Sequence, residues 1–168
     1  MKPFMALPPE SHRLRPDHLA TPFSADQIRD GCPVGRLISV RHEEPGAAPT
    51  YLQIRFIQAD VDGATHALTP TDADGLPIGP SVEGRSTWLE LQGHASQPAD
   101  RTTCEETTID LRWGPEPCWK YVVTEPDGET RFWFAQRLPG MPVVVESWER
   151  GRLTSRSEVV ASSTPGSG

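Results

Sequence analysis

Apolar and polar residues alternate in four runs over the last third of the chain, which predicts a β-meander across residues 118–160. Turn-forming groups separate the runs: Pro126-Asp127-Gly128, Leu138-Pro139-Gly140 and Arg150-Gly151. Each run is rich in Val, Thr or aromatic side chains, which suit a pleated, half-buried surface. Successive side chains leave opposite faces of a strand, so Phe132 and Phe134 share one face and Trp133 lies on the other. The second strand of the meander therefore carries aromatic residues on both faces.

The earlier two thirds of the chain predict two short helices and four more strands. Ser24 and Gln27 have the spacing of a capping box, and the helix that they begin should end near Gly31. A second helix is predicted over residues 86–97, where Leu91 and its neighbours recur at helical spacing. The further strands are predicted over residues 34–42, 50–58, 64–68 and 102–111.

Prolines and glycines mark the segments outside these elements. The chain has 18 prolines, and those near its start predict an extended or disordered arm over residues 1–22. Residues 23–160 are then a single α+β domain, and residues 161–168 a disordered tail rich in Ser, Thr, Pro and Gly. Residues 69–83 are predicted as a long loop. Its Asp72-Ala73-Asp74-Gly75 run favours a turn over a calcium site, because Pro77 stands where a calcium loop needs glycine.

Together these elements predict an α+β fold built on one sheet. The order of helix, strands, helix and strands favours a single curved antiparallel sheet of about seven or eight strands. The sheet is expected to be half-barrel-like, with the two short helices on its concave face.

Composition and charge narrow the class of protein. The 168 residues carry a net charge of -7, with both signs interspersed, so no nucleic-acid partner is expected, because phosphate binding needs a clustered basic face. No transmembrane segment or signal peptide is expected, which predicts a cytoplasmic protein. The odd cysteine count of 3 and the lack of a CxxC pair favour reduced thiols.

The sequence offers no motif for catalysis, metal binding or a cofactor. None of the five histidines forms a metal-binding pair on one element, so no metal site, no cofactor and no catalytic residue is predicted. His94 is interpreted as a hydrogen-bonded helix residue at the core edge. A sharper hypothesis pairs His94 with Cys32 or Cys104 as a catalytic or metal-binding group, which would make the chain an enzyme.

The aromatic residues of the final third are the strongest functional signal. They are interpreted either as plain core or as the wall of an apolar site. The leading hypothesis is a domain that binds an apolar small molecule or acyl chain between the meander and the two helices. The alternatives are a protein-interaction or structural domain without a ligand and, with less support, an enzyme. The oligomeric state is left open. The candidate ligand-binding residues are Ile28, Trp88, Leu91, Tyr121, Phe132, Phe134 and Trp148.

One run of the meander carries a resemblance to known proteins. It reads Phe132-Trp133-Phe134-Ala135, then Leu138-Pro139-Gly140-Met141-Pro142-Val143, then Glu146. This run resembles the closing strands of small uncharacterised bacterial proteins and, loosely, strand-turn-strand units of the LolA/LolB-like half-barrel carriers. The resemblance implies a curved antiparallel sheet around an apolar cavity plugged by helices, and an apolar or lipid-modified ligand. It carries over no functional residue.

Overall fold

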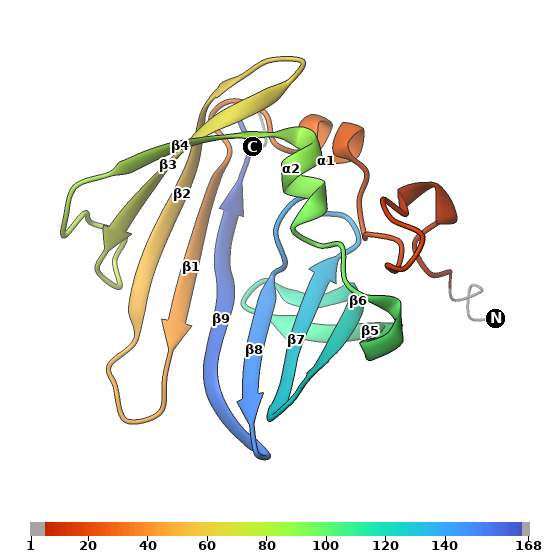
Figure 1. The fold of residues 1–168 in the computed structure, drawn as a ribbon. Coiled ribbons are helices and arrows are strands. Elements are labelled where there is room, and N and C mark those ends of the chain that lie inside the picture. The colour runs from red at the N-terminus through yellow and green to blue at the C-terminus, as the bar shows by residue number, and fades with distance from the viewer. Residues whose placement is uncertain (1–5, 166–168) are drawn as a thin grey trace.

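Nine strands form one antiparallel sheet in this computed structural model, which describes residues 6–165 (Figure 1). The strands are β1 (Leu37–Glu43), β2 (Thr50–Ala59), β3 (Gly63–Thr71), β4 (Val82–Thr87), β5 (Thr102–Leu111), β6 (Gly114–Glu125), β7 (Gly128–Ala135), β8 (Val144–Glu149) and β9 (Arg152–Ser163). Their order in the sheet is β4-β3-β2-β1-β9-β8-β7-β6-β5. Each strand pairs with its sequence neighbour except at the centre, where β1 lies beside β9 and joins the two halves. The predicted meander is confirmed as β6 to β9.

The predicted number of strands, seven or eight, is wrong because β4 was not foreseen. Residues 82–87 fell partly in the predicted loop and partly in the predicted second helix. They form an edge strand with largely exposed side chains, among them Val82, so the segment lacks the alternation that marks a half-buried strand. The sheet is open, with β4 at one edge and β5 at the other.

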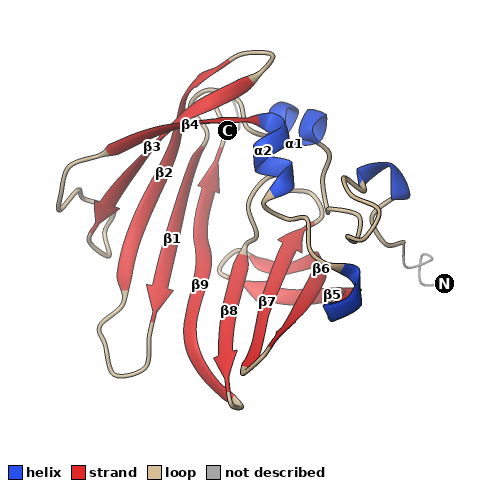
Figure 2. Cartoon of the chain, in the orientation of Figure 1, coloured by secondary structure: helices blue, strands red, loops and turns tan. Residues whose placement is uncertain are grey.

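Both helices begin at capping boxes. For α1 (Ala25–Gly31) the predicted box is confirmed, since the Gln27 amide N–H donates to Ser24 Oγ at 3.2 Å and Ser24 N–H donates to Gln27 Oε1 at 3.0 Å. For α2 (Trp88–Gly93) the box uses Thr87 and Glu90. Because Thr87 is also the last residue of β4, the strand runs directly into the helix, which is shorter than the predicted residues 86–97. Figure 2 shows the two helices close together at one end of the sheet, and α1 contacts α2.

The segment before α1 contacts α2 through His12 and Thr21, which both accept hydrogen bonds from the Gln92 side chain. His12 and Thr21 are buried, and a short 3-10 helix spans Glu10–His12. The sequence predicts an extended or disordered arm over residues 1–22, of which the structure describes residues 6–22. Phe4 and Met5 of this arm lie outside the described residues. At the other end β9 continues to Ser163, into the predicted tail.

The sheet has two faces of different chemistry. We call the face against α1 and α2 the inner face; it carries Ile38 on β1 and Phe132 on β7. The opposite, outer face carries charged side chains, such as Arg156 of β9, which forms ion pairs with Glu146 and Glu158. Within residues 6–165 no helix has the length and apolar character to cross a membrane.

Candidate functional site

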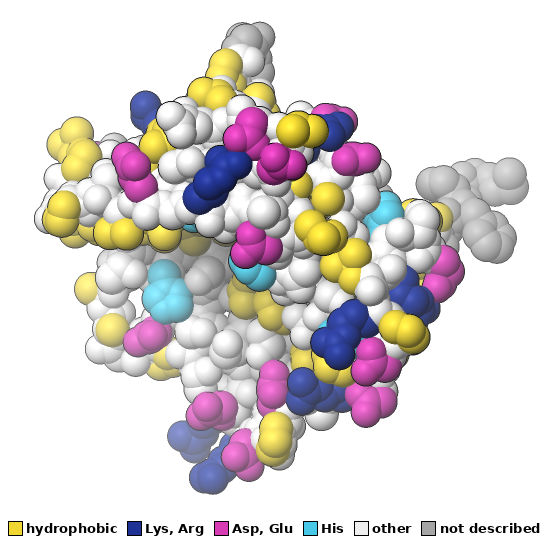
Figure 3. Space-filling model, turned by 45° about the horizontal axis from the view of Figure 1, so that its top comes forward, with side chains coloured by type: hydrophobic (Ala, Val, Ile, Leu, Met, Phe, Trp, Pro, Cys, Tyr) yellow, Lys and Arg dark blue, Asp and Glu magenta, His cyan; other side chains and the backbone are white. Residues whose placement is uncertain are grey.

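An apolar cavity of about 390 Å³ lies between the inner face and the helices. Figure 3 shows a hollow on this side of the molecule, with hydrophobic side chains along its wall. A volume of this size falls within the range of about 300–1,000 Å³ that small-molecule sites occupy. The described residues that line the cavity are Ile28, Cys32, Ile38, Ile54, Phe56, His66, Leu68, Ser86, Leu91, His94, Ala95, Gln97, Tyr121, Phe132, Phe134, Gly140, Met141 and Pro142.

Three aromatic rings from β6 and β7 form one wall. The Tyr121 and Phe134 rings meet edge to face with centroids 5.6 Å apart, and Phe132 stacks on Phe134 at 6.3 Å. The Tyr121 hydroxyl donates a hydrogen bond to the Ala20 carbonyl at 2.7 Å. Burial raises the pKa of this phenol, so it stays neutral. Since its hydroxyl is already engaged, Tyr121 presents only its ring to the cavity.

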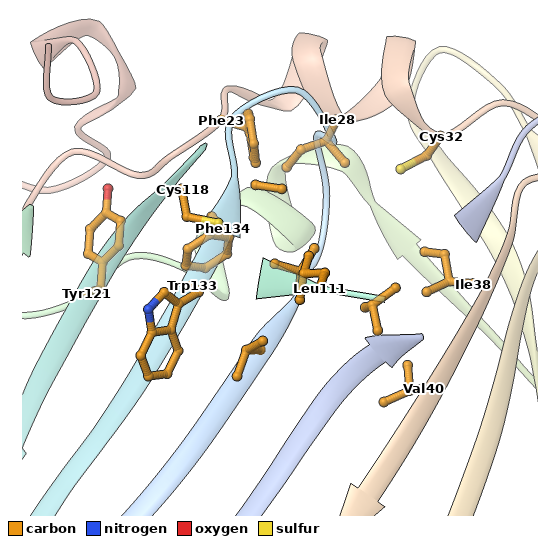
Figure 4. Close-up of a cluster of buried hydrophobic side chains, with 14 of the residues drawn as sticks. Phe23, Ile28, Cys32, Ile38, Val40, Leu111, Cys118, Tyr121, Trp133 and Phe134 are labelled. Carbon is orange, nitrogen blue, oxygen red and sulfur yellow. The ribbon is translucent and has the colours of Figure 1, made fainter. Parts of the chain in front are cut away.

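Branched aliphatic residues from the other half of the sheet form the facing wall. Ile38 of β1 is opposite Ile54 of β2, which in turn is opposite Leu68 of β3. Cross-strand pairing places these three side chains in one row on the inner face. Figure 4 shows Ile28 and Cys32 entering from the α1 segment and Ile38 from β1. The cavity is thus bounded by strands from both halves of the sheet and closed by the helices.

A buried arginine secures the end of the cavity at Gly140. The Arg36 side chain is 4% exposed, and its Nη1 donates to the carbonyls of Gly31 at 2.9 Å and Pro139 at 2.6 Å. The same nitrogen lies 3.1 Å from Cys32 Sγ. Gly140 has a φ of 131°, and a Cβ there would meet Arg36 Nη1 at 3.3 Å and Cys32 Sγ at 3.4 Å. Glycine at this position therefore lets the chain pass closely over the guanidinium.

The thiols near the site are protonated at neutral pH. Burial raises the pKa of Cys32, although the neighbouring Arg36 acts in the opposite direction. Burial also raises the pKa of Cys104 to about 11 and that of Cys118 to about 12. No group of three or more His, Cys, Asp or Glu side chains within residues 6–165 is arranged to hold a metal ion. Within residues 6–165 no hydrogen bond joins the His94 side chain to a cysteine thiol, so no contact supports the hypothesis that the two act together.

The structure brings five of the seven candidate ligand-binding residues to the cavity. They are Ile28, Leu91, Tyr121, Phe132 and Phe134. Trp88 is buried elsewhere, with its indole N–H donating to the Asp60 carbonyl at 2.8 Å. Trp148 packs under the Arg131 guanidinium, 4.4 Å from ring centroid to Cζ, and its indole N–H bonds to Glu146. Neither tryptophan lines the cavity.

Several lining residues were not among those candidates. Ile54 and Phe56 of β2 alternate with polar residues and therefore share one face, but this alternation does not say which distant strands share that face. The pairing of β1 with β9 decides this, because it joins β2 and β3 to the same sheet as the meander. His66, Met141 and Pro142 had no signal in the sequence that pointed to a site.

The polar side chains in the lining are few. They are His66, Ser86, His94 and Gln97. Among the described residues that border the cavity there is no Asp, Glu, Lys or Arg. An apolar enclosure with a small number of polar groups is the usual composition of a small-molecule site.

Comparison with known proteins shows a shared fold only. No protein-family model matches the chain, and no curated protein sequence matches it. The structure of MucB in complex with MucA(peri) is similar with a TM-score of 0.55 and 13% identity, over 86% of this chain and 55% of that one. The Pseudomonas aeruginosa MucA/MucB complex gives 0.53 and 12%, over 85% and 56%. This chain therefore spans little more than half of the MucB chains that it matches.

A structure of a LolA superfamily protein from Nitrosomonas europaea also matches, with 14% identity over 84% of this chain and 92% of that one. Its TM-score of 0.24 is too low to support an argument about the fold or the site. LolA superfamily proteins are thus among the structural neighbours.

Proposed function

We propose that this domain binds an apolar small molecule or an acyl chain in the cavity between the inner face and the helices. The observation that carries the proposal is a partly open cavity of about 390 Å³ lined by aliphatic and aromatic side chains from both halves of the sheet. An interior that served only as core would be packed close to crystal density, with few voids larger than a water molecule. In this proposal the sheet is half-barrel-like, and its concave face holds both the helices and the ligand.

The energy of binding would come from burial of hydrocarbon. Each methylene group transferred from water into an apolar site contributes about 0.8 kcal/mol. The walls present ring faces and branched aliphatic groups, such as Phe132 and Ile54. A chain of several methylene groups is the ligand class that gains most from such walls.

The direct test is to identify what the purified protein carries. The full chain is extracted with organic solvent, the extract is analysed by mass spectrometry, and an environment-sensitive fluorescent fatty acid is titrated into the extracted protein. The proposal predicts a co-purifying lipid or apolar compound, and a saturable fluorescence increase that unlabelled fatty acid reverses. An empty extract together with an unchanged fluorescence signal would refute it.

A protein-interaction domain is the second candidate. The β3–β4 hairpin exposes Leu76 and Ile78 in its loop and Val82 at the start of β4, which are 63%, 69% and 64% exposed. MucB is found in complex with MucA. Exposed apolar groups gathered at one place often mark a contact surface. Light scattering of the purified chain, compared with a Leu76→Ser/Ile78→Ser variant, tests this candidate. It predicts an assembly that the variant disrupts, whereas a carrier stays monomeric in both forms.

The cytoplasmic location stays a prediction. Cell fractionation with an antibody against the chain tests it, and recovery of the protein outside the cytoplasm would contradict it.

A further inference from the structure

We infer that the ligand is a long-chain carboxylic acid, with its hydrocarbon chain against the aromatic wall and its carboxylate at His66 and His94. The inference rests on the proposed function, because it requires that the cavity be a binding site. It adds the chemical class of the ligand and its orientation.

The two histidines at the cavity differ from the other three in their hydrogen bonding. His12, His18 and His42 each have a ring nitrogen within 3.0 Å of an oxygen acceptor or donor, namely Thr21 O, Ser96 Oγ and Ser157 Oγ. Within residues 6–165 no hydrogen bond is made to the ring of His66 or of His94, and both rings line the cavity. An imidazole always carries at least one N–H donor, whatever its protonation state. His66 is half-buried and His94 is exposed, so the cavity has one partly buried donor and one solvent-accessible donor available for a ligand.

These donors come from adjoining elements. His66 lies on β3 and pairs across the sheet with Gly84 of β4, and Ser86 follows two residues later on the same face of β4. β4 continues directly into α2, whose C-terminal cap is His94, and α2 contacts both β3 and β4. His66, Ser86 and His94 therefore belong to one side of the cavity, formed by β3, β4 and α2.

The opposite side is apolar. Tyr121, Phe132 and Phe134 come from β6 and β7, beyond β1, β9 and β8 in the sheet order. Phe132 and Phe134 have no polar atoms in their side chains, and the Tyr121 hydroxyl is bonded to Ala20. A ligand with one polar end and a long apolar body fits this division. Its polar end then meets the polar side chains of β3, β4 and α2, and its apolar body meets the aromatic rings.

The charge distribution favours an anionic head. The chain carries 23 acidic residues, yet none lines the cavity. The buried guanidinium of Arg36, which contacts the lining residue Cys32, has two backbone carbonyls among its acceptors and forms no ion pair within residues 6–165. Glu90, one turn before His94, accepts a hydrogen bond from the Thr87 N–H at the helix cap and also interacts electrostatically with His94. A carboxylate in the cavity therefore meets the His66 donor with no acidic side chain in the lining.

The test compares three ligands that share a hydrocarbon chain and differ in the head: dodecanoic acid, dodecanol and dodecylamine. Each is titrated into the delipidated full chain by displacement of a fluorescent probe, below the concentration at which it forms micelles. The chains compared are the wild type, His66→Leu, His94→Leu and the donor-retaining His66→Gln and His94→Gln. His42→Leu is the matched control, because His42 lies on β1 outside the cavity. Thermal melts verify that every chain is folded.

The wild type should bind the acid about tenfold more tightly than the alcohol, the gain expected of a charge-assisted hydrogen bond, and should bind the amine most weakly. Each leucine variant should reduce the ratio of acid to alcohol affinity, each glutamine variant should retain more of it, and His42→Leu should keep it. An alcohol that binds the wild type as tightly as the acid, or a ratio unchanged in both leucine variants, overturns the head-group inference and leaves the proposed function standing. Failure of the wild type to bind any of the three ligands overturns both.

Discussion

Arg36 Nη1 donates a hydrogen bond to the backbone carbonyl of Pro139 across 103 residues of chain, at 2.6 Å. The bond joins the residue just before β1 to the loop between β7 and β8, whose residues Gly140 and Met141 line the cavity. The same guanidinium also holds the Gly31 carbonyl at the end of α1. One buried side chain therefore fixes both the helix and the loop that bound one end of the cavity.

Replacing Arg36 with methionine should destabilise the domain. The change removes the Arg36 donor from the partly buried carbonyls of Gly31 and Pro139, and its cost is expected to be about 2 kcal/mol in the free energy of unfolding. Urea denaturation followed by tryptophan fluorescence measures it. Arg29→Met is the control, because Arg29 forms only partly exposed ion pairs with Asp26 and Asp30, and it should change stability by less than about 0.5 kcal/mol. Equal losses in the two variants would contradict this role for Arg36.

Glu116 should make the stability of the domain sensitive to acid. Burial acts to raise the pKa of this wholly buried carboxyl, but hydrogen bonds from Arg137 and Trp113 outweigh it, so the pKa lies below the ordinary value of 4.5. A lowered folded pKa stabilises the protein above pH 4.5, and this contribution is lost as the pH falls through the folded pKa. Glu116→Gln should therefore cost about 2 kcal/mol at pH 7 and much less near pH 3. Denaturation curves at several pH values check this, and a loss that is independent of pH would count against it.

Gln92 should hold the segment before α1 in place. This buried amide accepts from Ala25 N–H at 2.9 Å and donates to His12 O at 3.2 Å and to Thr21 Oγ1 at 3.1 Å. Gln92→Leu removes these three hydrogen bonds and leaves the Ala25 N–H without its acceptor, so we expect a loss of about 2 kcal/mol. The segment should also become accessible to protease. Limited trypsin digestion should cleave at Arg13 or Arg15 faster in the variant than in the wild type, and identical digestion patterns would refute the link.

The three thiols should react slowly while the protein is folded. Thiolate is the reactive form, and a pKa of about 11 for Cys104, against the ordinary 9.0, lowers its fraction about a hundredfold at neutral pH. Iodoacetamide at pH 7.5, with the modified protein counted by mass spectrometry, should label the chain rapidly only after denaturant is added. Fast labelling of Cys32 in the folded protein would instead support the hypothesis of an enzyme that uses this thiol.

Capping and turn residues in the sequence correctly predicted the elements that they begin or separate. The capping box of Ser24 and Gln27 begins α1 as expected, and the turn at Pro126-Asp127-Gly128 separates β6 from β7. The same local reasoning failed at residues 82–87, because an edge strand with exposed side chains has no apolar period to detect. It also extended the second helix beyond Gly93, since Ala95 and its neighbours continue the helical spacing.

The candidate site depended on information that is not local. Alternation assigned Phe132 and Phe134 to one face and Trp133 to the other, and the structure confirms that only the first two border the cavity. Trp148 was assigned to the site for its aromatic character, but it lies outside the cavity. The pairing of β8 with β9 shifts register between Ser147 and Trp148, and the Trp148 ring packs against the Arg131 guanidinium. Leu68 and His66 could not be assigned, because their proximity to the meander follows from the pairing of β1 with β9.

The most direct test of the binding site is to fill the cavity from within and compare the effect with the same change outside it. Leu91 of α2 lines the cavity, whereas Leu89 of the same helix is 59% exposed. Calorimetric titration with dodecanoic acid should give saturable binding for the wild type and for Leu89→Trp, and no saturable binding for a folded Leu91→Trp. Undiminished binding by Leu91→Trp would contradict the assignment of this cavity as the ligand site.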